Sequence, residues 1–149
     1  MDKTLHDQIV SIIDDVDDMT IATVRPDGYP QATTVSYVND GMTIYFGTTE
    51  TAQKAKNIAE NDKVSITVNR AYSDWKEIEG LSMAATAYLV TDPEEEERIT
   101  DLMLEKFPQI PEYESMMEGE VPVFFRVEPS VVSLLDYRKG FGHTDLVEI

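Results

Sequence analysis

Tight-turn residues between short β-branched segments are the feature that most constrains the fold of this chain. Asn39-Asp40-Gly41 is the strongest short hairpin signal, because glycine readily adopts the positive φ that tight connections need. Arg25–Pro30 is a second turn segment, in which proline fixes φ and Gly28 is free to take positive φ. Strands joined by such short turns pair antiparallel. The first part of the chain is therefore predicted to form an antiparallel meander.

Hydrophobic periodicity predicts the other elements. Apolar residues recur every three to four positions between Lys3 and Val16, which predicts an amphipathic helix. A short helix is predicted over Glu50–Glu60. A longer helix is predicted to begin at Thr91-Asp92-Pro93, a cap followed by proline and an acidic first turn, and to reach Lys106. The six predicted strands cover 19–24, 31–38, 42–47, 63–69, 75–90 and 123–135.

This order of elements favours a mainly β chain with helices, of the α+β class, built on a six-stranded antiparallel barrel. A doubly wound parallel sheet fits less well, because it needs a helix between most strands. The length of 149 residues suits one domain over 1–149. We divide it into an N-terminal helix in 1–18, a barrel with inserted helices over 19–135, and a C-terminal tail over 136–149.

Charge and composition narrow the partners. The chain has 12 Lys and Arg against 29 Asp and Glu, a formal charge of −17, so its surface repels nucleic acid and anionic membranes. Small molecules and other copies of the chain are the expected partners. The lack of cysteine excludes thiolate metal sites and cysteine nucleophiles and fits a reducing cytoplasm. No apolar run approaches the roughly 20 residues of a membrane span, so we expect a soluble cytoplasmic protein. With two histidines, neither a hydrolase constellation nor a metal centre has support.

The junction near residue 50 is the most informative place for function. Thr48, Thr49 and Thr51 stand where a predicted strand ends and a helix begins, and Lys54 follows in the first turn. Unpaired helix N–H groups, hydroxyls and one cation can converge on a phosphate there. The alternative is that the threonines cap the helix and Lys54 is a solvated surface residue.

Several motifs resemble the pyridoxamine 5′-phosphate oxidase-like superfamily, the FMN-binding split barrels, and in particular its small general stress protein branch. The resemblance covers about residues 5–135. The motifs that carry it are Asp27-Gly-Tyr-Pro-Gln31, Ile44-Tyr-Phe-Gly-Thr48, Lys54-Ala-Lys-Asn-Ile-Ala-Glu-Asn61, Val64-Ser-Ile66 and Ala85-Thr-Ala87.

The resemblance implies a six-stranded split barrel and a homodimer with FMN bound at the subunit interface. Its phosphate and ribityl contacts would fall on Gln31, Ala32, Thr33, Thr34, Thr48, Thr49, Gln53 and Lys54. The family often has Arg at Gln31, Ser at Ala52 and Arg at Gln53. Either Thr49, Thr51, Lys56 and helix N–H groups compensate for these differences, or FMN binds weakly.

The segment Leu135–Asp145 concentrates cations, aromatic residues and glycines with one histidine. Such a loop can fold over a ligand, so Tyr137, Lys139 and His143 are candidates for substrate contacts, with His143 able to exchange a proton near neutral pH. An ordinary tail tied to the partner subunit is an equal alternative.

Aromatic residues on or near the predicted strands offer a different kind of contact. Tyr45, Tyr72 and Trp75 could stack on an isoalloxazine ring, although aromatic residues on barrel strands more often belong to the core or an interface.

Three functional hypotheses follow. The first is an FMN-binding oxidoreductase that passes electrons from a reduced donor to a small acceptor; the flavin carries the redox chemistry and no catalytic residue is assigned. Oxidation of pyridoxamine phosphate is not expected, because the basic substrate-binding residues found near the C-terminus of those oxidases have no counterpart here. The second is a non-catalytic module that binds or senses a flavin, a deazaflavin or haem. The third is an interaction protein with an empty barrel.

Overall fold

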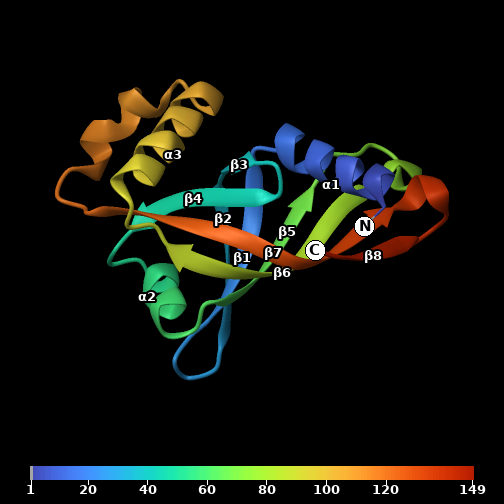
Figure 1. The fold of residues 1–149 in the computed structure, drawn as a ribbon, viewed down its shortest axis with the longest axis horizontal. Coiled ribbons are helices and arrows are strands. Elements are labelled where there is room, and N and C mark those ends of the chain that lie inside the picture. Colours follow the sequence, from blue (N-terminus) through green and yellow to red (C-terminus); the bar gives the residue numbers. More distant parts are fainter. Residues whose placement is uncertain (1) are drawn as a thin grey trace.

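The computed structural model describes residues 2–149, which form one curled antiparallel sheet covered by helices (Figure 1). The α-helices are α1 (Lys3–Asp15), α2 (Gln53–Glu60) and α3 (Pro93–Lys106). The short 3₁₀ helices are η1 (Trp75–Glu77), η2 (Ile110–Met117) and η3 (Tyr137–Lys139). The strands are β1 (Asp18–Val24), β2 (Pro30–Ser36), β3 (Val38–Asp40), β4 (Thr43–Thr49), β5 (Lys63–Asn69), β6 (Glu79–Leu89), β7 (Pro122–Asp136) and β8 (Thr144–Glu148).

Strand order in the sheet is β2-β1-β5-β6-β7-β4-β3, and β8 pairs with β7. Every pair is antiparallel. The 15-residue β7 pairs with β6 along one edge, and with β4 and then β8 along the other. A register shift at Ala84/Ala85 marks an irregularity that bends the β6–β7 pair. The two ends of this strand order, β2 and β3, leave the barrel split.

The predicted α+β class and antiparallel architecture are confirmed, but the strand count is eight among the described residues rather than six. One extra strand is β3, whose connection to β4 uses Gly41 at φ +59° as the hairpin signal predicted. The predicted meander is wrong beyond β1 and β2, because β2 ends at Ser36 and β4 pairs with β3 and β7 at the other end of the strand order. The other extra strand is β8, so the predicted tail is partly sheet. The strand predicted over 75–90 begins only at Glu79, because Asp74 accepts a hydrogen bond from the Lys76 N–H and starts η1 instead.

The main core lies between α1 and the concave face of the sheet. Ile9, Ile12 and Ile13 of α1 are fully buried, as the periodicity of this segment predicts. Tyr37 is also fully buried, and its hydroxyl donates to the Ile13 carbonyl at 2.7 Å. The helix begins after Asp2, whose Oδ1 accepts from the Thr4 N–H at 2.8 Å.

A smaller core cluster holds α3 against the outer face of the sheet. Ile99 of α3 packs on Tyr45 of β4 and on Val38 of β3, all of them buried. Figure 1 shows α3 on the opposite side of β4 from the main body. No helix within residues 2–149 combines the length and apolarity needed to cross a membrane.

A buried polar network joins α1 to the far end of the β6–β7 pair. Gln8 of α1 donates to both Glu79 at 2.6 Å and Asp136 at 2.9 Å. Arg138 binds both carboxylates, and Arg70 donates to Glu79 at 2.7 Å. The Arg138 guanidinium beside Asp136 lowers the pKa of that carboxyl to about 2. Both carboxylates are therefore buried with hydrogen-bonded partners, as buried charges require.

We predict that Asp136→Asn lowers the free energy of unfolding at pH 7 by about 2 kcal/mol. This is the free energy that corresponds to lowering the pKa of the carboxyl from 3.8 to about 2 on folding. The folded pKa lies below the unfolded one. The stabilisation is therefore present above about pH 4 and is lost as the pH falls through about 2. Urea denaturation at pH 7, 4 and 2.5 measures it. The exposed Asp101→Asn is the control, and a difference between wild type and Asp136→Asn that does not shrink in acid would contradict the prediction.

Candidate functional site

The threonines at the junction of β4 and α2 do not cap the helix. Thr48 and Thr49 are the last residues of β4, and the N-cap of α2 is Ala52, which offers no side-chain hydrogen bond. The capping interpretation of the threonines is therefore wrong. The hydroxyls of Thr49 and Thr51 lie 3.5 Å apart, and Thr51 also approaches the Glu120 carboxylate at 3.4 Å.

The first turn of α2 brings a local positive charge to this junction. Lys54 is half-buried, and Lys56 is exposed. Within residues 2–149, neither lysine forms an ion pair. The N–H groups of Ala55 and Lys56 return to the Ala52 carbonyl, whereas those at the very start of a helix have no intrahelical acceptor. The start of α2 therefore carries N–H donors without intrahelical acceptors and two lysines without ion pairs, in an acidic protein.

Strand β2 presents the predicted residues on two faces. Gln31 and Thr33 are half-buried on the inner face, and Ala32 and Thr34 are exposed on the other. Strand β2 pairs only with β1, so its other edge has no strand partner among the described residues. Half of the predicted β2 residues thus face inward and half face solvent.

Asn57 of α2 is a site residue that the sequence analysis did not single out. It is fully buried, and its amide donates to Thr23 at 3.0 Å and to Gln31 at 3.2 Å. Gln53 donates to the Asn57 side-chain oxygen at 2.8 Å. Asn57 therefore connects β1, β2 and the start of α2. The available signal was a pair of polar amides, Gln53 and Asn57, one helical turn apart on α2.

Thr33 carries an unsatisfied hydroxyl. Its Oγ1 is the one buried side-chain polar atom without a hydrogen-bond partner in the described part of the chain. Buried polar groups are rarely left unpaired, and an unpaired one costs about 1–3 kcal/mol. Gln31, on the same face of β2, contacts α2 through Asn57. Thr33 therefore lies just beyond this contact along the strand, on the face turned inward.

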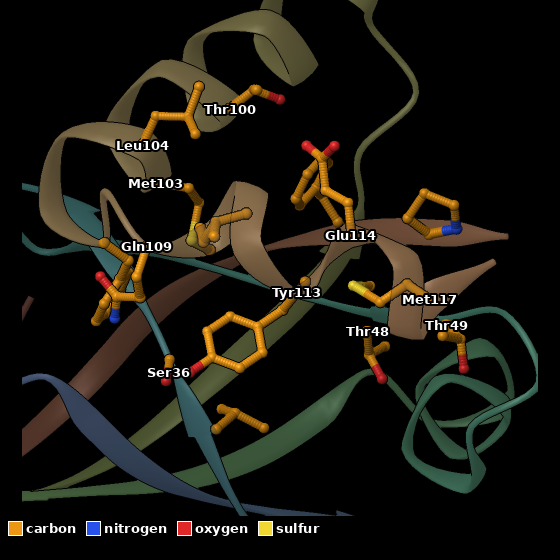
Figure 2. A pocket seen from close by; sticks show the side chains of 16 residues that line it. Ser36, Thr48, Thr49, Thr100, Met103, Leu104, Gln109, Tyr113, Glu114 and Met117 are labelled. Carbon is orange, nitrogen blue, oxygen red and sulfur yellow. The ribbon is translucent and has the colours of Figure 1, made fainter. Parts of the chain in front are cut away.

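A cavity of about 580 Å³ continues from this point beneath α3 and η2 (Figure 2). Val35, the next inward residue of β2, lines it together with Thr48 and Thr49 of β4. Its other walls are mostly apolar side chains of α3, η2 and β7. Of the predicted cofactor residues, Thr48 and Thr49 line this cavity, whereas the predicted residues of β2 and α2 lie beside it.

The C-terminal candidates lie elsewhere. Lys139 and His143 both contact Asp145, at 3.3 and 3.1 Å, and these contacts lower the Asp145 pKa. Figure 1 shows β8 on the side of the molecule away from α2 and α3, and the segment before it follows the end of β7 at Asp136. Within one chain, the structure does not bring Tyr137, Lys139 and His143 to the junction of β4 and α2.

The three aromatic candidates have different surroundings. Tyr45 is buried in the cluster beneath α3, and burial raises the pKa of its hydroxyl. It is therefore unavailable for stacking on a ligand. Trp75 is exposed, and its ring centroid lies 6.3 Å from that of Phe141 near η3. Tyr72 is exposed as well. Stacking by Tyr72 or Trp75 stays a prediction.

We predict that Asn57→Ala lowers the free energy of unfolding by about 1–3 kcal/mol, because it leaves buried partners of Asn57 unpaired. Chemical denaturation measures the loss. Lys56→Ala, an exposed change in the same helix, should stay within about 0.5 kcal/mol of wild type. Equal stability of the two variants would show that the amide network does not secure α2.

The family model described as pyridoxamine 5′-phosphate oxidase matches residues 5–136. The chain belongs to this family. No curated protein matches it at the level of sequence.

Three solved structures show how widely the fold is shared. Conserved hypothetical protein Rv2991 from Mycobacterium tuberculosis is 24% identical, with a TM-score of 0.77 over 97% of this chain and 91% of that one. A candidate pyridoxamine 5′-phosphate oxidase from Listeria innocua is 21% identical, with a TM-score of 0.70 over 89% and 98%. HutZ, a haem storage protein from Vibrio cholerae, is 20% identical, with a TM-score of 0.69 over 83% and 88%. These likenesses support the split-barrel fold.

Proposed function

We propose that the protein binds FMN along β2, the end of β4 and the start of α2, and acts as an oxidoreductase that passes electrons to a small acceptor. The observation that carries the proposal is the unpaired buried hydroxyl of Thr33, which lies on β2 between Gln31, the contact with α2, and Val35, which lines the cavity. A ligand bound along β2 could form a hydrogen bond with the Thr33 hydroxyl and so supply its missing partner.

In this proposal the start of α2 holds the phosphate. Lys54 and Lys56 supply charge, and the N–H groups of Gln53 and Lys54 supply donors aligned with the helix dipole. The hydroxyl of Thr49 adds a further donor on the β4 side. These groups matter more here than in a neutral protein, because the chain carries a formal charge of −17.

Gln31 and Gln53 take a positioning role. The family often has arginine at both positions, whereas here both amides are tied to the buried Asn57. They therefore fix β2 relative to α2 but add no positive charge. This arrangement leaves Lys54 as the half-buried cation of the site and makes phosphate affinity depend on it.

Strand β2 would position the ring system. Its unpaired edge leaves main-chain donors and acceptors near 31–34 free for a planar, hydrogen-bonding ligand. The flavin would supply the redox chemistry, and the chain would supply binding, orientation and exclusion of water. None of the described residues then needs to act as an acid or base.

A homodimer completes the proposed site. The exposed Ala32 and Thr34 face away from the chain's own core, so a second copy can cover them. Tyr137, Lys139 and His143 reach a ligand only if they come from the partner, because in one chain they lie at the other end of the sheet. We place this dimer in the cytoplasm, a setting that the lack of cysteine fits.

We predict that Lys54→Ala weakens FMN binding about 5- to 150-fold, the equivalent of about 1–3 kcal/mol for a charge-assisted contact. Quenching of flavin fluorescence on titration measures the affinity. Lys63→Ala removes the same charge just beyond the opposite end of α2, where Lys63 pairs with Asp62, and should change the affinity less than twofold. Equal effects of the two variants would contradict a phosphate site at Lys54.

We predict that Thr33→Val separates stability from binding. Replacing an unpaired buried hydroxyl by a methyl group leaves the flavin-free protein as stable as wild type or more stable. FMN affinity should fall at least severalfold, because the ligand loses a partner. Thermal denaturation and flavin titration measure the two effects on the same preparation. Unchanged FMN affinity would remove the observation on which the proposal rests.

A haem-binding or haem-storing module is the second candidate, favoured by the likeness to the haem storage protein from Vibrio cholerae. The absorption spectrum of the purified protein distinguishes the two. Flavin bands that a nicotinamide donor bleaches and air restores favour the oxidoreductase. A Soret band favours the haem module.

A further inference from the structure

The cavity beneath α3 and η2 has walls of unequal rigidity. Helix α3 is fixed to the sheet, because Arg126 of β7 donates to both oxygens of Glu95 at 2.9 and 3.0 Å. Lys106 at its end donates to the carbonyls of Val16 and Tyr37 at 2.8 and 3.0 Å. Among the described residues, η2 forms no side-chain hydrogen bond, and its residues from 111 to 117 are all exposed. The cavity therefore has a firm roof and an adaptable side wall.

Side chains from both walls point into the cavity (Figure 2). The ring of Tyr113 extends from η2 toward Ser36 at the end of β2, and Met103 of α3 and Met117 of η2 lie on either side. At about 580 Å³ the cavity is of the size that accepts small organic ligands. Methionine side chains adapt to ligands of different shape, which suits an apolar occupant.

Charge around the cavity is one-sided. Of the sixteen lining residues, Glu114 alone is charged. It is exposed and unpaired in the described part of the chain, and Figure 2 shows it on the side of the cavity nearer α3. The cations of the overlying segment are already bound, Arg98 to Asp40 and Lys106 to backbone carbonyls. An anion entering this cavity would find no counter-charge and one repelling carboxylate.

The cavity and the proposed cofactor site share a wall. Thr48 and Thr49 line the cavity and belong to the junction with α2, and Val35 lines it two residues beyond Thr33 on the same face of β2. Gln31 and Val35 are roughly 13 Å apart along the strand. The positively charged start of α2 and the cavity that carries Glu114 are therefore neighbours, and Thr48 and Thr49 belong to both.

We propose that this cavity binds the substrate, and that the substrate is a small, largely apolar molecule without negative charge, with any cationic end beside Glu114. Its role as electron acceptor rests on the proposed flavin function. The inference about its chemistry rests on the cavity lining alone. An unphosphorylated apolar substrate would approach the flavin from the side away from Lys54.

Three probes of one shape and different charge test the proposal: naphthylmethylammonium, naphthylmethanol and naphthoate. The protein is labelled at its methionine methyl groups, and each probe is titrated by NMR with and without saturating FMN. The signals of Met103 and Met117 should shift with the cation and the neutral probe. Met19 and Met83, buried in the main core, serve as internal controls. Naphthoate should bind at least tenfold more weakly than the cation.

A charge reversal localises the discrimination. Glu114→Lys should strengthen naphthoate binding and weaken binding of the cation, each about three- to tenfold, as expected for one partly exposed charge. Glu112→Lys makes the same change on η2 outside the lining and should alter either affinity less than twofold. Neither glutamate side chain has a hydrogen-bond or ion-pair partner among residues 2–149, so both variants should fold.

The outcomes separate this inference from the proposed function. Absence of shifts at Met103 and Met117, equal binding of naphthoate, or displacement of the probe by FMN would overturn the inference; displacement would assign the cavity to the flavin or to a surface that FMN binding closes. Equal effects of the two lysine variants would also overturn it. If the probes bind with the expected order but FMN does not bind, the cavity stands as a site for apolar cations and the flavin function fails.

Discussion

Backbone pairing along β7 is the constraint on which the rest of the structure depends. This 15-residue strand pairs with β6 over Phe125–Asp136 on one side, and with β4 and then β8 on the other, so a single strand belongs to both halves of the sheet. The irregularity at Ala84/Ala85 lets this long ladder bend instead of remaining flat. Because β4 is attached through β7, the position of Thr48 and Thr49 relative to β2 follows from this curvature.

Within that frame, one buried amide sets the geometry of the site. Asn57 joins Thr23, Gln31 and Gln53 across β1, β2 and α2, and each of these contacts would be costly to lose in an enclosed position. This explains why uncharged glutamines can stand where the family often has arginine: they position the elements. The positive charge of the proposed site comes from the lysines at the start of α2, whereas the neighbouring cavity carries the carboxylate of Glu114. The two ends of the proposed site therefore select for different chemistry.

Much of the fold was predictable because local patterns agreed with it. The amphipathic period of α1, the glycine at Gly41 and the β-branched runs all specify their elements without reference to distant residues. Strand β8 was not predictable, since Thr144–Glu148 become a strand only because the end of β7 offers an unpaired edge. The start of β6 was missed because Asp74 turns the preceding residues into η1.

The sequence by itself determined the antiparallel class, the family and the junction near residue 50, because turn chemistry, periodicity and short motifs are local properties. Only the tertiary structure decided which of these groups meet. It paired Gln31 with Asn57, left the Thr33 hydroxyl unsatisfied, buried Tyr45 under α3 and moved the C-terminal residues to the far end of the sheet. Such pairings depend on contacts between residues far apart in the chain, and neither propensity nor spacing specifies those contacts.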